Sequence, residues 1–107
     1  MNEFTKSERK MLRALADDVC EAEVRACLEA LAEQFDRWRS GEIHSAALLD
    51  ALQSFHKGRL RELGSIHGSL KDDELVARGV ALGYLALEKI PEPCRQKVAN
   101  HGFLRTA

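Results

Sequence analysis

The most constraining feature of this sequence is an apolar repeat that runs through its first forty residues. The repeat consists of two stripes at three- and four-residue steps, which are Leu12, Leu15 and Val19, followed by Leu28, Leu31, Phe35 and Trp38. Such spacing is typical of the buried face of an amphipathic helix. The sequence therefore predicts one long helix with Trp38 in the core. The two stripes are slightly out of phase near Asp17 and Asp18, which leaves room for a bend there.

The composition favours helices throughout the chain. Leucine and alanine supply 29 of the 107 residues, whereas valine, isoleucine and threonine supply 10. Strands prefer β-branched side chains, and no segment alternates between apolar and polar residues. A chain of this length encloses one hydrophobic core. We therefore expect an all-α fold, a small antiparallel bundle of four to five helices that forms a single domain over residues 1–107.

Three patterns predict where helices begin. Thr5 with Glu8 can form a capping box at the start of the long helix. Ser45 can cap a second helix that runs to about Lys57, and Ser69 with Asp72 can form a box before a helix over about 73–88. A last short helix is expected over about 92–100, after Pro91 and with Pro93 in its first turn.

Glycines predict where helices end or approach one another. Gly58 marks a stop or a bend, followed by a short helical stretch over about 59–67. Gly79 and Gly83 fall inside the predicted helix over 73–88, where glycine costs helix stability. Their presence indicates close approach by another helix.

The charge balance gives no reason to expect a nucleic-acid partner. Sixteen basic and seventeen acidic residues leave a formal charge of −1, and the balance is also close to even within each third of the chain. The charged N-terminal segment has no apolar run typical of a signal peptide or membrane span, so no membrane association is expected. Three cysteines without a dense framework fit free thiols in a cytoplasmic protein.

No metal or cofactor is expected. The four histidines, His44, His56, His67 and His101, do not form a pair at three- or four-residue spacing on one helix. A pair of cysteines two residues apart, which would complete a tetrahedral site, is also missing from the sequence.

An enzymatic alternative comes from two arginine–histidine spacings. Helical ribonucleases of the HEPN type carry an arginine, a polar residue and a histidine four to six residues after the arginine. Arg61 with His67 fits this spacing, and Arg95 with His101 fits it equally well. In such a site the histidine handles a proton while the arginine offsets phosphate charge. The resemblance covers these motif residues alone, and Gly64 interrupts the first of them.

The densest cationic stretch lies between Phe55 and Leu63 and contains His56, Lys57, Arg59 and Arg61. These side chains can receive carboxylates or a phosphate, because arginine offers a planar, forked set of donors. The alternative interpretation is a helix C-terminus whose cations oppose the helix dipole. This stretch is the candidate partner-binding surface, and no catalytic residue is assigned in the leading hypothesis.

Two segments, FDRWRSGEI at 35–43 and FHKGRLREL at 55–63, resemble the core of small uncharacterised bacterial helical proteins. The resemblance implies an all-helical domain and transfers no activity. The leading hypothesis is therefore a non-enzymatic interaction protein that self-associates or docks a protein partner, since so small a core profits from association. The runner-up is a HEPN-like protein that cleaves or binds RNA.

Overall fold

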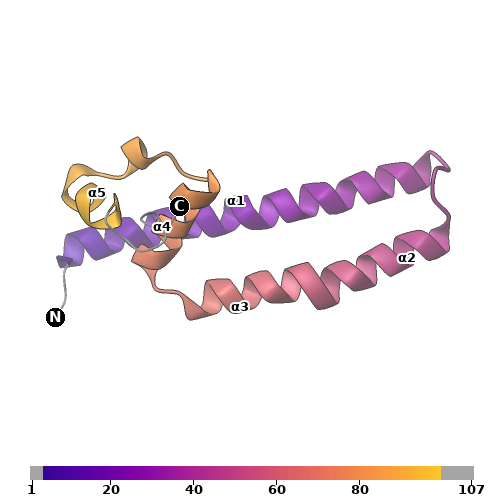
Figure 1. The fold of residues 1–107 in the computed structure, drawn as a ribbon, viewed down its shortest axis with the longest axis horizontal. Coiled ribbons are helices and arrows are strands. Elements are labelled where there is room, and N and C mark those ends of the chain that lie inside the picture. Colours follow the sequence, from indigo (N-terminus) through magenta and orange to yellow (C-terminus); the bar gives the residue numbers. More distant parts are fainter. Residues whose placement is uncertain (1–3, 100–107) are drawn as a thin grey trace. The chain divides into compact units, whose positions relative to one another are not determined.

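The computed structural model describes residues 4–99, which are helical apart from their connections (Figure 1). The elements are α1 (Lys6–Arg39), α2 (Ser45–Ser54), the π-helical segment η1 (Phe55–Leu60), α3 (Arg61–Ser69), α4 (Asp72–Leu82), the 3-10 turn η2 (Leu87–Lys89) and α5 (Glu92–Ala99). Since α2, η1 and α3 follow one another without a break, the described chain holds four helices and one 3-10 turn, with no strand between residues 4 and 99. The predicted all-α fold class is confirmed.

Helix α1 begins as its sequence predicts. The Thr5 backbone N–H donates to Glu8 Oε1 at 2.8 Å, and the Glu8 N–H donates to the Thr5 hydroxyl at 3.1 Å. This reciprocal pair satisfies two backbone donors that the first turn leaves without helical partners. Helix α1 then continues to Arg39 without interruption at Asp17 or Asp18.

The predicted starts of α2 and α4 are confirmed to within one residue, but the predicted capping residues are wrong. His44 is the N-cap of α2 and makes no side-chain capping bond, while the hydroxyl of Ser45 accepts a hydrogen bond from Trp38 Nε1 at 3.0 Å. The N-cap of α4 is Lys71, whose N–H donates to Glu74 Oε1 at 2.9 Å. In α2 the hydroxyl of Ser45 bonds to the Trp38 side chain and does not cap the helix. In α4 the bond between Lys71 and Glu74 replaces the predicted capping box of Ser69 and Asp72.

Two predicted helix ends also differ from the structure. Gly58 neither stops nor breaks the helix, because the chain passes through the π-helical turn η1 and continues into α3. Helix α4 ends at Leu82 rather than near Glu88. Gly83 has a φ of 87°, a left-handed conformation that glycine adopts without steric cost, and the Tyr84 N–H donates back to the Gly79 oxygen at 2.8 Å.

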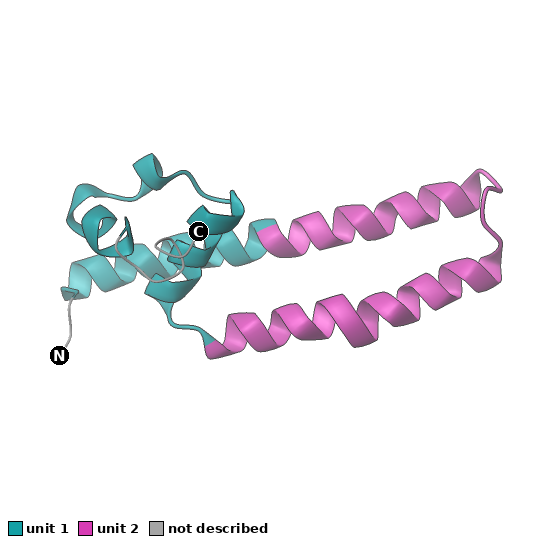
Figure 2. Cartoon of the chain, viewed as in Figure 1, with its two compact units in different colours: residues 1–22, 70–107 teal, residues 23–69 magenta. Residues whose placement is uncertain are grey.

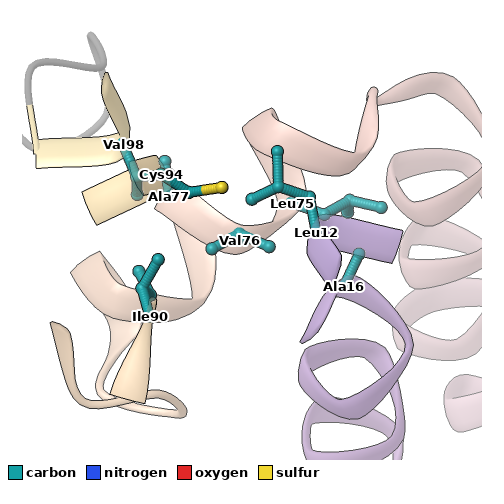
Figure 3. Close-up of a cluster of buried hydrophobic side chains, with 8 residues drawn as sticks. All are labelled: Leu12, Ala16, Leu75, Val76, Ala77, Ile90, Cys94 and Val98. Atoms are coloured by element: carbon teal, nitrogen blue, oxygen red, sulfur yellow. The ribbon is translucent and has the colours of Figure 1, made fainter. Parts of the chain in front are cut away.

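Contacts divide the chain into two compact units (Figure 2). Unit 1 comprises residues 1–22 and 70–107, and unit 2 comprises residues 23–69. The core of unit 1 gathers eight buried side chains from α1, α4, the segment after η2, and α5 (Figure 3): Leu12, Ala16, Leu75, Val76, Ala77, Ile90, Cys94 and Val98. The prediction of a single domain stays a prediction.

Gly79 allows two helices of unit 1 to approach closely. A Cβ built on Gly79 would overlap the side chain of Val19, lying 2.7 Å from Val19 Cγ1. The predicted close approach is therefore confirmed at Gly79. It is wrong at Gly83, where a Cβ would meet open space and the glycine instead ends the helix.

Unit 2 is a helical hairpin in which α1 pairs with the continuous helix α2–η1–α3. A hydrogen bond joins Trp38 to Ser45 near the turn, and another joins Glu23 to His67 at the opposite end. These two contacts establish that the helices run antiparallel. Within 4–99 we find no helix long and apolar enough to cross a membrane.

Candidate functional site

A buried carboxylate lies between the two helices of the hairpin. The side chain of Glu23 on α1 is fully buried, and its Oε1 lies 2.9 Å from Nε2 of His67 on α3. Its Oε2 lies 3.5 Å from Nη2 of Arg59 on η1. A carboxylate in a protein interior is very costly unless it is paired and hydrogen-bonded. Glu23 therefore links α1 to both η1 and α3 of the hairpin.

Arg59 connects this carboxylate to Cys27, one helical turn further along α1. A hydrogen bond to the Cys27 side chain raises the pKa of the Arg59 guanidinium. Desolvation partly opposes this shift, whereas attraction to Cys27, Glu62 and Glu23 adds to it. Arg59 also pairs with Glu62 at 3.2 Å. Because the shift is upward, Arg59 is a cation at neutral pH.

The π-helical turn places His67 opposite Glu23. In an undistorted helix, at about 100° per residue, Leu48 and His67 would lie about 100° apart around the axis. A π turn closes its hydrogen bonds one residue later than an α turn and thus absorbs about one residue of rotation. Buried Leu48 and His67 are thereby brought onto the same inward face. The sequence does not predict this alignment of Leu48 and His67, because Gly58 within η1 predicts a helix end or a bend.

Glu23 could have been found in the sequence from its phase. Val19, Glu23 and Cys27 are spaced by four residues, so they share one side of α1. The charged residues Glu21, Arg25, Glu29 and Glu33 of α1 are exposed, whereas Glu23 interrupts a row of small apolar side chains. A single carboxylate in such a row indicates a partner on the facing helix.

The predicted partner-binding residues do not act as one set. His56, Lys57 and Arg61, with Leu60, line an open depression of about 260 Å³ on the hairpin. Arg59 is directed instead to Glu23 and Cys27.

The predicted pair of Arg61 and His67 is not brought together in the structure. Arg61 and His67 are six positions apart on α3, about 120° around the axis, and only His67 contacts Glu23. Arg95 donates to the backbone oxygens of Ile90 and Glu88, each at 3.0 Å, and pairs with Glu92. His101 lies outside the described residues. Residues 4–99 contain no group of three or more His, Cys, Asp or Glu side chains able to hold a metal ion.

The hairpin carries an apolar face that nothing in unit 2 covers. Leu28 is 49% exposed, Leu49 62% and Leu60 37%. Leu28 lies about 100° around α1 from inward-facing Cys27, and Leu49 is displaced from buried Leu48 by the same angle in the same sense. Because the helices are antiparallel, the same sense of rotation leads to the same side of the hairpin. Leu60 is displaced in that sense from buried Leu63 as well. We call Leu28, Leu49 and Leu60 the apolar face.

Trp38 lies near the turn of the hairpin and is 40% exposed. The expectation of a core tryptophan is therefore wrong, and so is the expectation that Leu28 is buried. Arg37 pairs with Glu42 and Arg39 pairs with Asp36, at 3.0 and 3.1 Å. The Arg37–Glu42 pair therefore spans the turn, and the Arg39–Asp36 pair lies within the last turn of α1.

Comparison of the chain with protein-family models, with curated proteins and with solved structures finds no match.

Proposed function

We propose that this protein is a helical interaction protein that self-associates through the apolar face of its hairpin. The observation that carries the proposal is the small amount of apolar burial in unit 2. Across residues 23–69, all of which the structure describes, Leu48 and Leu63 are the buried apolar side chains, while three leucines of similar size are exposed. Two helices alone bury too little apolar surface for a stable unit.

A second copy of the chain is the occupant that best matches this face. Leucines from both helices lie on one side of the hairpin, so two hairpins related by a twofold axis can place identical surfaces against each other. The result is a four-helix arrangement around a shared core. Each leucine that passes from half-exposed to buried contributes about 1 kcal/mol, and a dimer contains six of them.

The polar cluster at Glu23 supports a structural role rather than a catalytic one. Glu23 is fully buried and His67 is largely buried, which leaves little room for a substrate at the pair. The RNA-cleaving alternative gains no support from Arg61 and His67, because they point to different faces of α3. Cys20, Cys27 and Cys94 are not joined by disulfides, which supports the cytoplasmic location that is part of this proposal.

Sedimentation velocity across a concentration series tests self-association. We expect the wild-type chain to show a concentration-dependent dimer and Leu49→Glu to remain monomeric, because the new carboxylate lies in the centre of the contact. Ala47→Glu is the matched control, since Ala47 is an exposed residue of α2 about 100° to the other side of Leu48.

A second pair on α1, Leu28→Glu against Ala26→Glu, repeats the comparison with exposed positions on either side of Cys27. A wild-type chain that is monomeric at several hundred micromolar contradicts the proposal. So does an equal shift of the dimer population by the face variants and their controls. Circular dichroism confirms that each variant keeps its helices.

A further inference from the structure

A row of cations occupies one side of the first two turns of α1. Lys6, Arg9, Lys10 and Arg13 are spaced by three, one and three residues, which puts them on a single helix face. Together with Ser7 and Asp72 they line an open depression of about 860 Å³ in unit 1. We call these four residues the basic stripe. It was hidden by the even charge balance of each third of the sequence.

The cations of the basic stripe are available to a ligand. All four side chains are exposed, and no ion pair within residues 4–99 joins them to a carboxylate. Arg9 donates from Nη1 to the backbone oxygen of Phe4 at 3.2 Å, which leaves its other guanidinium donors for solvent. The one acidic residue in this part of the helix, Glu8, is held by Thr5 and Lys97 instead.

The position of these charges is unfavourable for the helix itself. Residues 6–13 carry four basic residues and one acidic residue, whereas residues 14–39 carry three basic and seven acidic residues. Cations near a helix N-terminus oppose the positive end of the helix dipole, and anions near the C-terminal half oppose the negative end. Helix stability therefore does not account for the basic stripe, and a negatively charged ligand does.

We propose that the basic stripe binds the phosphate backbone of duplex nucleic acid. From Lys6 to Arg13 the stripe extends about 10 Å along the helix axis, a length that matches about three successive phosphates of one strand. A row of donors fits a row of phosphates, whereas a single phosphate group is usually held by donors that converge. The open form of the depression also fits a rod-shaped ligand.

The surroundings of the stripe favour a duplex over other polyanions. No aromatic side chain lines the depression, so the stacking surface that single strands use is missing from it. The exposed large apolar residues of the described chain are Leu28, Trp38, Leu49, Leu60 and Leu82, and none of them lines the depression, which argues against insertion into a membrane. Contacts to phosphates position a duplex without reading its sequence.

Fluorescence anisotropy with a labelled 20-base-pair DNA duplex tests the proposal in the full chain at several salt concentrations. We expect binding that weakens with salt, with a slope of log K against log salt of about −3. The variant Lys6→Gln, Lys10→Gln, Arg13→Gln should lose most of this binding and reduce the slope to near −1. Arg9 is left unchanged because it contacts the Phe4 backbone.

The matched control removes three exposed cations elsewhere, by Arg25→Gln, Arg39→Gln, Lys89→Gln. It should bind like the wild type, and so should Lys6→Arg, Lys10→Arg. Equal loss in the stripe variant and the control overturns the proposal, as does tighter binding of a 20-nucleotide single strand. Binding only to phosphatidylserine vesicles or only to inorganic polyphosphate overturns it as well. Leu49→Glu distinguishes this surface from the apolar face, because it alters self-association and leaves the stripe intact.

Discussion

The two units of the chain are stabilised in different ways. Unit 1 packs eight buried apolar side chains into one core, among them Leu12, Val76 and Ile90. Unit 2 buries two leucines and a carboxylate, and it exposes three leucines on one face. An apolar core tolerates changes of similar volume, whereas a buried ion pair requires both of its partners. The same leucine- and alanine-rich composition thus yields one unit with a larger apolar core and another in which a buried polar contact joins the helices.

The largest effect is expected from His67→Leu in unit 2. This change leaves the Glu23 carboxylate buried without its nearest partner, and we expect unfolding free energy to fall by about 3 kcal/mol. Urea denaturation measures the loss. The double variant Glu23→Leu, His67→Leu should recover much of it, because neither charge nor polar group then remains buried. A double variant less stable than His67→Leu would show that the pair does not act as a unit.

A glycine comparison between the units comes next. Gly79→Ala should destabilise the protein by about 2 kcal/mol, because the new Cβ overlaps Val19 and unit 1 must shift to admit it. Gly64→Ala in α3 should instead stabilise it by about 0.5 to 1 kcal/mol, since a Cβ there meets no atom and alanine favours the helix. Thermal unfolding of both variants checks the opposite signs. If both substitutions changed the stability of the protein in the same direction, the packing at Gly79 would be no tighter than at Gly64.

The smallest effect concerns alkaline pH and Cys94 in unit 1. Burial raises the pKa of the Cys94 thiol, with a further rise from Glu8 that Lys97 partly offsets. The unfolded thiol therefore loses its proton at lower pH than the folded one. The stability that Cys94 supports is complete below the ordinary thiol pKa of 9.0 and falls as pH rises above it.

Unfolding free energy measured from pH 8 to 10.5 should decline more steeply in the wild type than in Cys94→Ala. The difference should reach at most about 1.4 kcal/mol per pH unit, the limit for one proton. Equal slopes in the wild type and in Cys94→Ala would show that the Cys94 thiol does not contribute to the pH dependence of the unfolding free energy.

The sequence predicts those features that depend on local chemistry. The capping box of Thr5 and Glu8 forms because its partners lie three residues apart and need nothing else. The long helix follows from a regular apolar repeat, and the close approach at Gly79 follows from the cost of glycine within a helix. Each of these inferences uses neighbours within one or two helical turns.

Features that depend on distant partners could not be predicted in the same way. The spacing of Glu23 from Val19 and Cys27 places it on the inner side of α1, but its partner His67 could not be predicted because it lies on another helix beyond the π-helical turn. Trp38 continues an apolar stripe, but its indole N–H finds Ser45 across the turn and the ring stays partly in solvent. The basic stripe is not visible in the net charge of long segments, because the acidic residues in the remainder of the helix cancel its positive charge.

The π-helical turn gives the hairpin one place where it can lose a residue. If one residue were lost near Gly58 and η1 closed as an ordinary α-helical turn, the two changes would offset each other, and later residues would keep their orientation relative to α2. His67 would then still face Glu23. A deletion elsewhere between 45 and 66 that left η1 in place would instead rotate His67 by about 100° away from Glu23. Chains that share this hairpin should therefore lose a residue within 55–60 more readily than in the rest of the segment.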